Sequence, residues 1–299
     1  MKLGLVIASH GRAEILQQVL VDLVSQRRIP DDIVISAVRA TDIPQISPGL
    51  ANVRTIFGGV GLTRQRNRGI SCLIDTVDLI AFIDDDFIVG DDYFLNMERI
   101  FLQDDSIVGL NAEIIADGAN SSGFTFDEGL RLAEQYRRRK KVPAIRETRG
   151  RYADGCNGIV ACRTASLGLL RFDERLPLYG WQEDRDFCAG LRRSGRIVKT
   201  NLIWGVHLGT KRGKGSEVGL GYSQIANPPY IVSKGNMSVA FAFRLATCNF
   251  IANLLKSIRS EKYVDRRGRL PGRGPAYCPY DSRRLSMTEV PSGSGSSPG

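Results

Sequence analysis

The sequence lacks any Cys-x-x-Cys pair, although it contains six cysteines, at positions 72, 156, 162, 188, 248 and 278. This spacing excludes a standard zinc ribbon and does not suggest a disulfide framework, so we expect reduced thiols in a cytoplasmic protein. The first apolar run, Leu3–Ala8, is too short and too rich in β-formers for a signal peptide. No stretch is apolar enough to span a bilayer comfortably, because Arg244, Asn249 and Asn253 interrupt the best candidate, 238–258.

Positive charge, in contrast, is in excess: the chain of 299 residues has a formal net charge of +9 at pH 7. Much of this charge lies in two blocks, Arg137–Lys141 and 256–284. Such blocks are either solvated surfaces or contacts with an anionic membrane or substrate. No nucleic-acid-binding motif is present, and the aromatic residues are not interleaved with the basic ones. We therefore expect no nucleic-acid partner.

Strand-like apolar runs alternate with amphipathic segments along most of the chain. The expected strands are 3–8, 33–38, 53–57, 78–83, 107–115 and 196–200, and the expected helices are 14–26, 62–75, 93–102, 127–140 and 183–194. This βαβ order predicts an α/β fold, with a mostly parallel sheet flanked by helices on both faces.

The C-terminal part of the chain does not continue the alternation of strands and helices. From Val239 to Ile258 apolar residues recur at helical spacing, which indicates a helix that either packs on the protein surface or lies in a membrane interface. The last residues are rich in Gly, Ser and Pro. We therefore divide the chain into a main domain, 1–235, an amphipathic helical extension, 236–270, and a flexible tail, 271–299.

Three consecutive acids, Asp84, Asp85 and Asp86, end the apolar run 78–83. A buried strand that stops in three carboxylates is costly unless they meet solvent, a cation or a hydrogen-bonding ligand. Because ligands bind at the carboxyl ends of strands in open α/β sheets, the cluster is either a solvated loop or a divalent-metal site for a diphosphate.

Three other groups bear on this choice. Glu183 and Asp184 open a helix after Trp181, where carboxylates act as caps or as a general base. His207 follows an apolar stretch, as a structural residue or a metal ligand. At the start of the helix 62–75, arginines flank Asn67, which suits an anion or a nucleotide base unless they are merely solvated.

Taken in order, these residues resemble the family 2 glycosyltransferases of the GT-A fold. The resemblance covers about residues 1 to 210. It rests on Phe82–Asp86, on Arg66–Ile70, on Gly155–Gly158 followed by Arg163, on Arg171–Leu176 and on Tyr179–Phe187.

The resemblance implies inverting transfer of a sugar from a nucleotide-diphosphate sugar to a hydroxyl of a saccharide or lipid-linked acceptor, in polysaccharide or glycolipid synthesis. It implies Asp184 as the base and Glu183 as the residue that positions the acceptor. The implied metal ligands are Asp86, Asp84 and His207, with Mn²⁺ or Mg²⁺ as the metal. The implied donor contacts are Ser9, Arg12, Arg66, Asn67, Asp84 and Asp85.

Two departures from the family pattern concern the donor. The first turn is Ser9-His10-Gly11-Arg12 instead of a Thr-Tyr-Asn type, and the second strand lacks terminal acids, with Asp42 the nearest. UDP-sugar is the default donor, and dTDP- and GDP-sugars stay open. The alternatives are a sugar-phosphate nucleotidyltransferase, suggested by Gly58–Arg64, and a non-catalytic nucleotide-sugar-binding protein. We expect a cytoplasmic protein with a peripheral contact at the inner face of the membrane.

Overall fold

The structure is a computed structural model that describes residues 1–46, 48–50, 52–119, 121–139, 142–147, 160–176, 180–211, 217–258 and 264–270. The turn 155–158, Tyr179 and the tail 271–299, which carried sequence-based predictions, lie outside the described residues. The division of the chain into domains stays a prediction.

The described residues form strands and helices that alternate through the first half of the chain. The strands are β1 (Leu3–Ser9), β2 (Asp32–Ala37), β3 (Val53–Phe57), β4 (Leu79–Asp84), β5 (Phe87–Val89), β6 (Ile107–Asp117), β7 (Ile145–Glu147), β8 (Val160–Arg163) and β9 (Arg196–His207). The helices are α1 (Ala13–Leu23), α2 (Leu62–Leu73), α3 (Tyr93–Gln103), α4 (Phe126–Arg137), α5 (Glu183–Leu191), α6 (Glu217–Ser233) and α7 (Val239–Ile258). The expected elements are present, with ends that mostly differ by a few residues. The strand expected at 196–200 continues to His207 as β9. The sequence did not indicate β5, β7 or α6.

All nine strands belong to one sheet, in the order β3-β2-β1-β4-β8-β6-β9-β5, with β7 paired to β9. The pairs β1–β2, β2–β3, β1–β4 and β6–β9 are parallel. The pairs β4–β8, β6–β8, β5–β9 and β7–β9 are antiparallel. The βαβ half of the sheet is therefore parallel, as expected, and the half that follows β4 is mixed.

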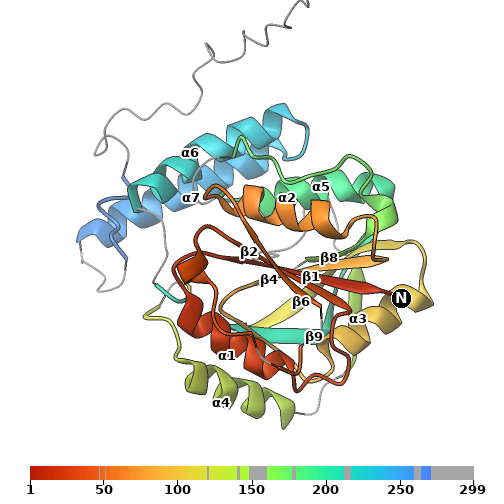
Figure 1. Cartoon of the computed structure of the whole chain (residues 1–299). Helices are drawn as coiled ribbons and strands as arrows, with labels where there is room; N and C mark the ends of the chain where they lie inside the picture. Colours follow the sequence, from red (N-terminus) through yellow and green to blue (C-terminus); the bar gives the residue numbers. More distant parts are fainter. Residues whose placement is uncertain are drawn as a thin grey trace, which may run out of the picture.

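Helices cover both faces of this sheet (Figure 1). On one face, α1 and α3 pack on a core that includes Leu16, Leu20 and Phe94. On the other face, α2 and α5 pack on a second core, in which the rings of Phe172 and Phe187 stack with centroids 4.1 Å apart. Both cores consist of β-branched, leucine and aromatic side chains, which supply the main driving force for folding.

The helices α6 and α7 lie side by side beyond α2 and α5 (Figure 1). The helix α6 was not expected because Gly219, Gly221, Pro228 and Pro229 interrupt its sequence, and these residues disfavour helix interiors. By length and composition alone α7 could cross a membrane, and 11% of its apolar window is buried. The helix expected at 238–258 is thus present, and its neighbour is α6.

Candidate active site

The acid cluster lies where β4 ends and the chain turns back at once into β5. Asp84 is the last residue of β4, Asp85 and Asp86 form the turn, and Phe87 pairs antiparallel with His207 at the end of β9. Because β9 also runs parallel to β6, Asp117 at the end of β6 pairs with His207 as well. Three strand ends therefore bring acids and a histidine to one edge of the sheet.

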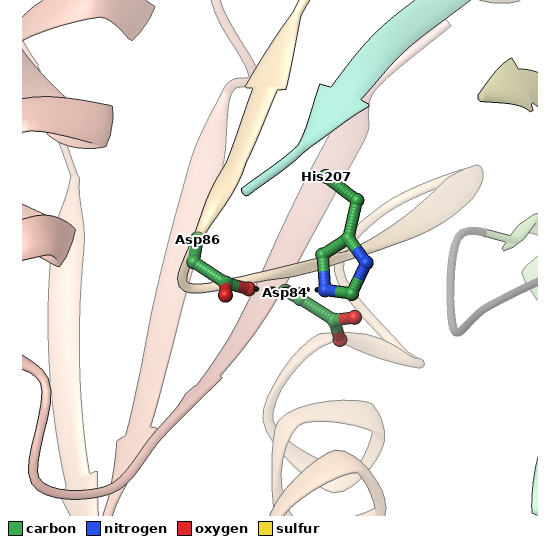
Figure 2. A group of neighbouring side chains, drawn as sticks. All are labelled: Asp84, Asp86 and His207. Atoms are coloured by element: carbon green, nitrogen blue, oxygen red, sulfur yellow. Dashed lines mark ion pairs between the residues drawn. The ribbon is translucent and has the colours of Figure 1, made fainter. Parts of the chain in front are cut away.

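Asp84, Asp86 and His207 form a group whose ligand atoms all lie within 4.8 Å of one another. Figure 2 shows their side chains turned toward a common space at the ends of β4 and β9. His207 Nε2 lies 3.4 Å from Asp86 Oδ1, which accepts no hydrogen bond from any described residue. Asp86 Oδ2 accepts a hydrogen bond from the Thr210 N–H at 2.7 Å. A buried carboxylate oxygen without a donor is a suitable ligand for a cation.

Even without a metal, His207 favours its protonated form and Asp86 its carboxylate form. Burial lowers the pKa of His207, but the contacts with Asp117 (2.8 Å from Nδ1) and Asp86 outweigh it and raise that pKa to about 10. Burial raises the pKa of Asp86, but His207, Arg12 and the Thr210 N–H outweigh it and lower the pKa below its usual range. The space between these side chains thus favours positive charge, whether a proton on His207 or a metal ion.

Asp85 points to the first turn of the chain. Its carboxylate accepts hydrogen bonds from Ser9 Oγ at 2.8 Å and from Arg12 Nη1 at 2.8 Å. Burial and the adjacent Asp86 raise the pKa of Asp85 to about 6, although Arg12 and Ser9 act in the opposite direction. Arg12 also donates to the carbonyl oxygen of Thr210 at 2.9 Å. Ser9 and Arg12, which were expected to contact the sugar nucleotide, therefore hold the turn after β1 against Asp85 of the acid cluster.

Arg66 joins the acid cluster to the second pair of acids. Its guanidinium donates from Nη2 to Asp84 Oδ1 at 3.1 Å and from Nη1 to Glu183 Oε1 at 2.9 Å. The residue is 2% exposed, and its guanidinium lies over the ring of Phe172. A planar guanidinium with fixed donors suits this bridge better than a lysine would. In this arrangement Arg66 links Asp84 of the acid cluster to Glu183 of α5.

Glu183 and Asp184 open α5, and a glycine turn sets their position. Gly180 (φ 67°) and Gln182 (φ 74°) have left-handed backbone conformations immediately before the helix. Both acids are buried in the first turn of α5, where the helix dipole favours carboxylates. Burial and the neighbouring Asp184 raise the pKa of Glu183 to about 8, although Arg66 lowers it. Asp184 Oδ1 accepts a hydrogen bond from the Arg185 N–H at 2.8 Å.

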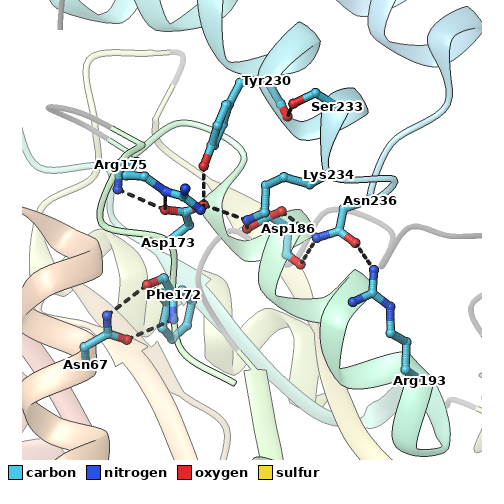
Figure 3. Close-up of polar contacts among 10 residues, drawn as sticks. All are labelled: Asn67, Phe172, Asp173, Arg175, Asp186, Arg193, Tyr230, Ser233, Lys234 and Asn236. Atoms are coloured by element: carbon cyan, nitrogen blue, oxygen red, sulfur yellow. Dashed lines mark hydrogen bonds and ion pairs between the residues drawn. The ribbon is translucent and has the colours of Figure 1, made fainter. Parts of the chain in front are cut away.

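The other side of α5 is fixed by a polar network to α6 (Figure 3). Lys234 contacts both Asp173 and Asp186, and Asn236 Nδ2 donates to Asp186 Oδ1 at 2.7 Å. Tyr230 Oη donates to Asp173 Oδ2 at 2.7 Å. Burial raises the pKa of Asp173, but Arg175, Lys234 and Tyr230 outweigh it and lower the pKa below its usual range. The helix that carries Glu183 and Asp184 is therefore fixed at its front by Arg66 and at its back by Lys234.

Asn67 connects α2 to the segment before α5. Its Nδ2 donates to the Phe172 carbonyl at 2.8 Å and to Glu174 Oε1 at 2.9 Å, and its Oδ1 accepts from the Phe172 N–H at 2.9 Å. These internal partners account for the side chain, and the expected contacts of Asn67 with a donor stay a prediction.

Sequence reasoning missed Asp117 and Gln65, and it noted Asp42 only as the acid nearest to the end of the second strand. Asp117 orients His207, and the sequence carried a signal for it, because Asp117 ends a strand as Asp84 does. Asp42 accepts from the backbone N–H groups of Gly11 and Arg39, both at 2.9 Å, so it holds the loops after β1 and β2. Gln65 Nε2 donates to the carbonyls of Ser9 and Ser36. No sequence signal marks these two roles, since both partners are backbone groups.

No protein-family model matches the chain, and no curated protein matches its sequence. Several solved structures are similar to this chain in fold. S. aureus TarS 1–349 in complex with UDP-GlcNAc has a TM-score of 0.53 and 14% identity, over 88% of this chain and 77% of that one. The same protein in complex with UDP has a TM-score of 0.50 and 15% identity, over 88% of this chain and 73% of that one.

The longer S. aureus TarS structure gives a TM-score of 0.50 and 14% identity, over 88% of this chain. Our chain spans 44% of the length of that protein. At these identities the similarity concerns the fold. The chain has the α/β fold of the GT-A type that the sequence predicted, with a central sheet flanked by helices.

Proposed function

We propose that the protein is a metal-dependent, inverting glycosyltransferase that resembles family 2 enzymes and transfers a sugar from a nucleoside-diphosphate sugar to an acceptor hydroxyl. One observation carries this proposal: Arg66 joins Asp84, in the candidate metal group, to Glu183, beside the candidate base. Glycosyl transfer needs these two parts close together, because the leaving diphosphate and the attacking hydroxyl both act on one anomeric carbon.

Asp84, Asp86 and His207 would hold the metal. Two carboxylates and an imidazole fit Mn²⁺ or Mg²⁺, and the nitrogen ligand favours Mn²⁺. A bound divalent cation would act as a Lewis acid that neutralises the charge on the diphosphate leaving group. Arg12 lies 3.5 Å from Asp86 and adds positive charge to this side of the site.

Asp184 would take the proton of the acceptor. The acceptor oxygen forms a bond to the anomeric carbon, the bond to the diphosphate breaks on the opposite face, and the hydroxyl proton passes to Asp184. We assign Glu183 to holding the acceptor instead, because burial and Asp184 raise its pKa to about 8 and so favour its protonated form at neutral pH. A protonated Glu183 can instead hold the acceptor through a hydrogen bond while Arg66 orients its other oxygen.

A UDP-sugar is the first donor to test. The similar structures of S. aureus TarS 1–349 contain UDP in one case and UDP-GlcNAc in another, which supports UDP as the nucleotide. We expect the acceptor to be a saccharide or a lipid-linked saccharide in polysaccharide or glycolipid synthesis.

A thermal-shift screen of nucleotide sugars with Mn²⁺ tests the proposal. We expect one nucleotide sugar to raise the Tm in Mn²⁺ and not in EDTA, since a ligand at one hundred times its Kd adds about 2.7 kcal/mol of stability. Asp86→Ala should lose this shift, whereas Asp127→Ala, at an exposed position of α4, should keep it. An equal shift in wild type and Asp86→Ala would contradict the metal assignment.

A further inference from the structure

The helix α7 leaves most of its large apolar side chains exposed, although Ala242, with Phe241 and Leu245 beside it, packs in an apolar cluster against the protein body. Its outward side carries Phe243, Leu255 and Ile258, which are 72%, 62% and 76% exposed. Its inward side carries Asn253, which is 4% exposed and donates from Nδ2 to Gln224 Oε1 at 2.9 Å. A helix packed on a soluble domain normally buries its apolar stripe and exposes its polar one.

The helix α6 likewise buries polar side chains and exposes apolar ones, although Ile231 is buried in the apolar cluster. Its buried side chains include Ser223, Gln224 and Asn227, and Asn227 Nδ2 donates to the Trp181 carbonyl at 2.8 Å. Its exposed side chains include Tyr222 and Ile225. The two neighbouring helices thus contact the protein body through polar groups as well as through the apolar cluster of Ile231 and Ala242, and they expose large apolar side chains on their other side. Exposed apolar surface of this kind marks a contact with a partner or a membrane.

The polar partners of α7 favour a helix that lies in a membrane interface over one that crosses the membrane. Asn253 is bonded to Gln224, and its Oδ1 accepts from Arg266 at 3.3 Å. A crossing helix would have to break these bonds and carry Asn249, Asn253 and Arg244 through hydrocarbon. An interfacial helix keeps the bonds and buries the outward side chains alone.

The positive charge of the C-terminal part of the chain distinguishes between a second copy of the protein, the tail and a lipid surface as the partner of this apolar face. Residues 256–284 contain nine Lys or Arg and three Asp or Glu, a net charge of +6 (9 − 3). A symmetric contact between two copies through α7 would bring Arg244 and Lys256 of both copies to one interface, with like-charge repulsion. The tail 271–299 is rich in Gly, Ser and Pro and offers few apolar side chains to cover the helices. An anionic lipid surface matches both the exposed apolar side chains and the positive charges of Arg244 and Lys256, which are exposed on the same helix.

We propose that the outward face of α6 and α7 docks on the surface of an anionic lipid bilayer, with α7 lying in the interface. Lys234, at the end of α6, contacts Asp186 on α5, so the docked layer is joined to the helix that carries Glu183 and Asp184. Docking would therefore hold the acceptor side of the site near lipid, where a lipid-linked acceptor resides. That consequence rests on the proposed transferase function, whereas docking itself does not.

Co-sedimentation with vesicles tests the proposal. The full chain should sediment with vesicles of phosphatidylcholine and phosphatidylglycerol and stay in the supernatant with phosphatidylcholine alone. Ile251→Gln combined with Leu255→Gln should weaken sedimentation about tenfold or more, since both side chains are exposed on α7. The matched control is Val21→Gln combined with Leu102→Gln. These two side chains are 55% and 62% exposed on α1 and α3, which lie on the opposite face of the sheet (Figure 1).

Four results would overturn the proposal. In two of them, wild-type protein does not sediment with anionic vesicles, or it sediments equally with neutral vesicles. In the other two, the α7 variant sediments as wild type does, or the control variant loses as much sedimentation as the α7 variant. A dimer in sedimentation velocity that the α7 variant converts to monomer would assign the face to a second copy instead. Donor hydrolysis without vesicles, measured on the same variants, tests the transferase function separately.

Discussion

Single residues give the two acid groups different chemistry through the partners that they already have. Asp85 and Glu183 are bonded to arginines, Asp86 keeps a carboxylate oxygen without a donor, and Asp184 is bonded through one oxygen to a backbone N–H. This difference supports the proposed roles, in which Asp85 and Glu183 position other groups and Asp86 and Asp184 act on bound ligands.

Asp184→Asn should abolish transfer and preserve donor binding. A general base contributes about 10²- to 10⁴-fold to a rate, and the amide keeps the size of the side chain without accepting a proton. The measurement is nucleoside-diphosphate release together with calorimetric binding of the UDP-sugar in Mn²⁺. Retained turnover with lost binding would refute the assignment of Asp184 as the base.

Glu183→Gln should change how stability depends on pH. The folded protein has a raised Glu183 pKa, about 8 against 4.5 for the free residue, so the unfolded chain loses its proton first as the pH rises. The stabilisation from this group is full below about pH 4.5 and is lost as the pH rises through 8, by ~5 kcal/mol at the usual 1.36 kcal/mol per pKa unit.

Urea unfolding at pH 5 and pH 8 measures this effect. We expect Glu183→Gln to gain stability relative to wild type at pH 8 compared with pH 5. Glu14→Gln, at an exposed position of α1, serves as the control. A Glu183→Gln difference that does not vary with pH would contradict a proton on Glu183 at neutral pH.

At the residue scale, the sequence revealed the acids that end a strand and not the partners that hold them. The triplet 84–86 and His207 were visible because each follows an apolar run. The bridge through Arg66 was not, because its two partners lie 18 and 117 positions away in the sequence. Long-range ion pairs have no local periodicity from which they can be predicted.

Among the elements, α5 is the one whose placement matters most to the proposed function, because it carries Glu183 and Asp184. Arg66 holds its first turn, and the contacts of Asp186 with Lys234 and Asn236 hold its outer side (Figure 3). The helix α6, which Lys234 directly follows, was unexpected from the sequence, because the paired prolines Pro228 and Pro229 usually indicate a helix end. Tertiary contacts overrode that local preference, as they also did for the three-residue strand β5.

Lys234→Met should destabilise the protein by about 2 kcal/mol, because it leaves two largely buried carboxylates, Asp173 and Asp186, without their common cation. Lys2→Met removes an exposed pair with Asp32 and should cost less than about 1 kcal/mol. Thermal or urea unfolding checks both values. Equal effects of the two substitutions would show that the network does not hold α5 and α6 together.

The whole molecule gathers the site at one edge of a sheet that is parallel in its first half and mixed in its second. The parallel half, β3-β2-β1-β4, follows from the βαβ pattern of the sequence. The mixed half does not, because β8, β5 and β7 are short and pair antiparallel with strands distant in sequence. That half nevertheless brings His207 and Asp117 to the acids of β4. The antiparallel pairings therefore complete the candidate metal group.

Product analysis with Mn²⁺ tests the central proposal most directly. The purified protein is incubated with a panel of UDP-sugars, and separately with UTP and sugar 1-phosphates. We predict slow release of UDP from one UDP-sugar, lost in Asp86→Ala, and no pyrophosphate from the second mixture. Pyrophosphate release without UDP release would make the protein a nucleotidyltransferase and would contradict the assignment of a glycosyltransferase site to Asp84, Asp86, His207 and Asp184.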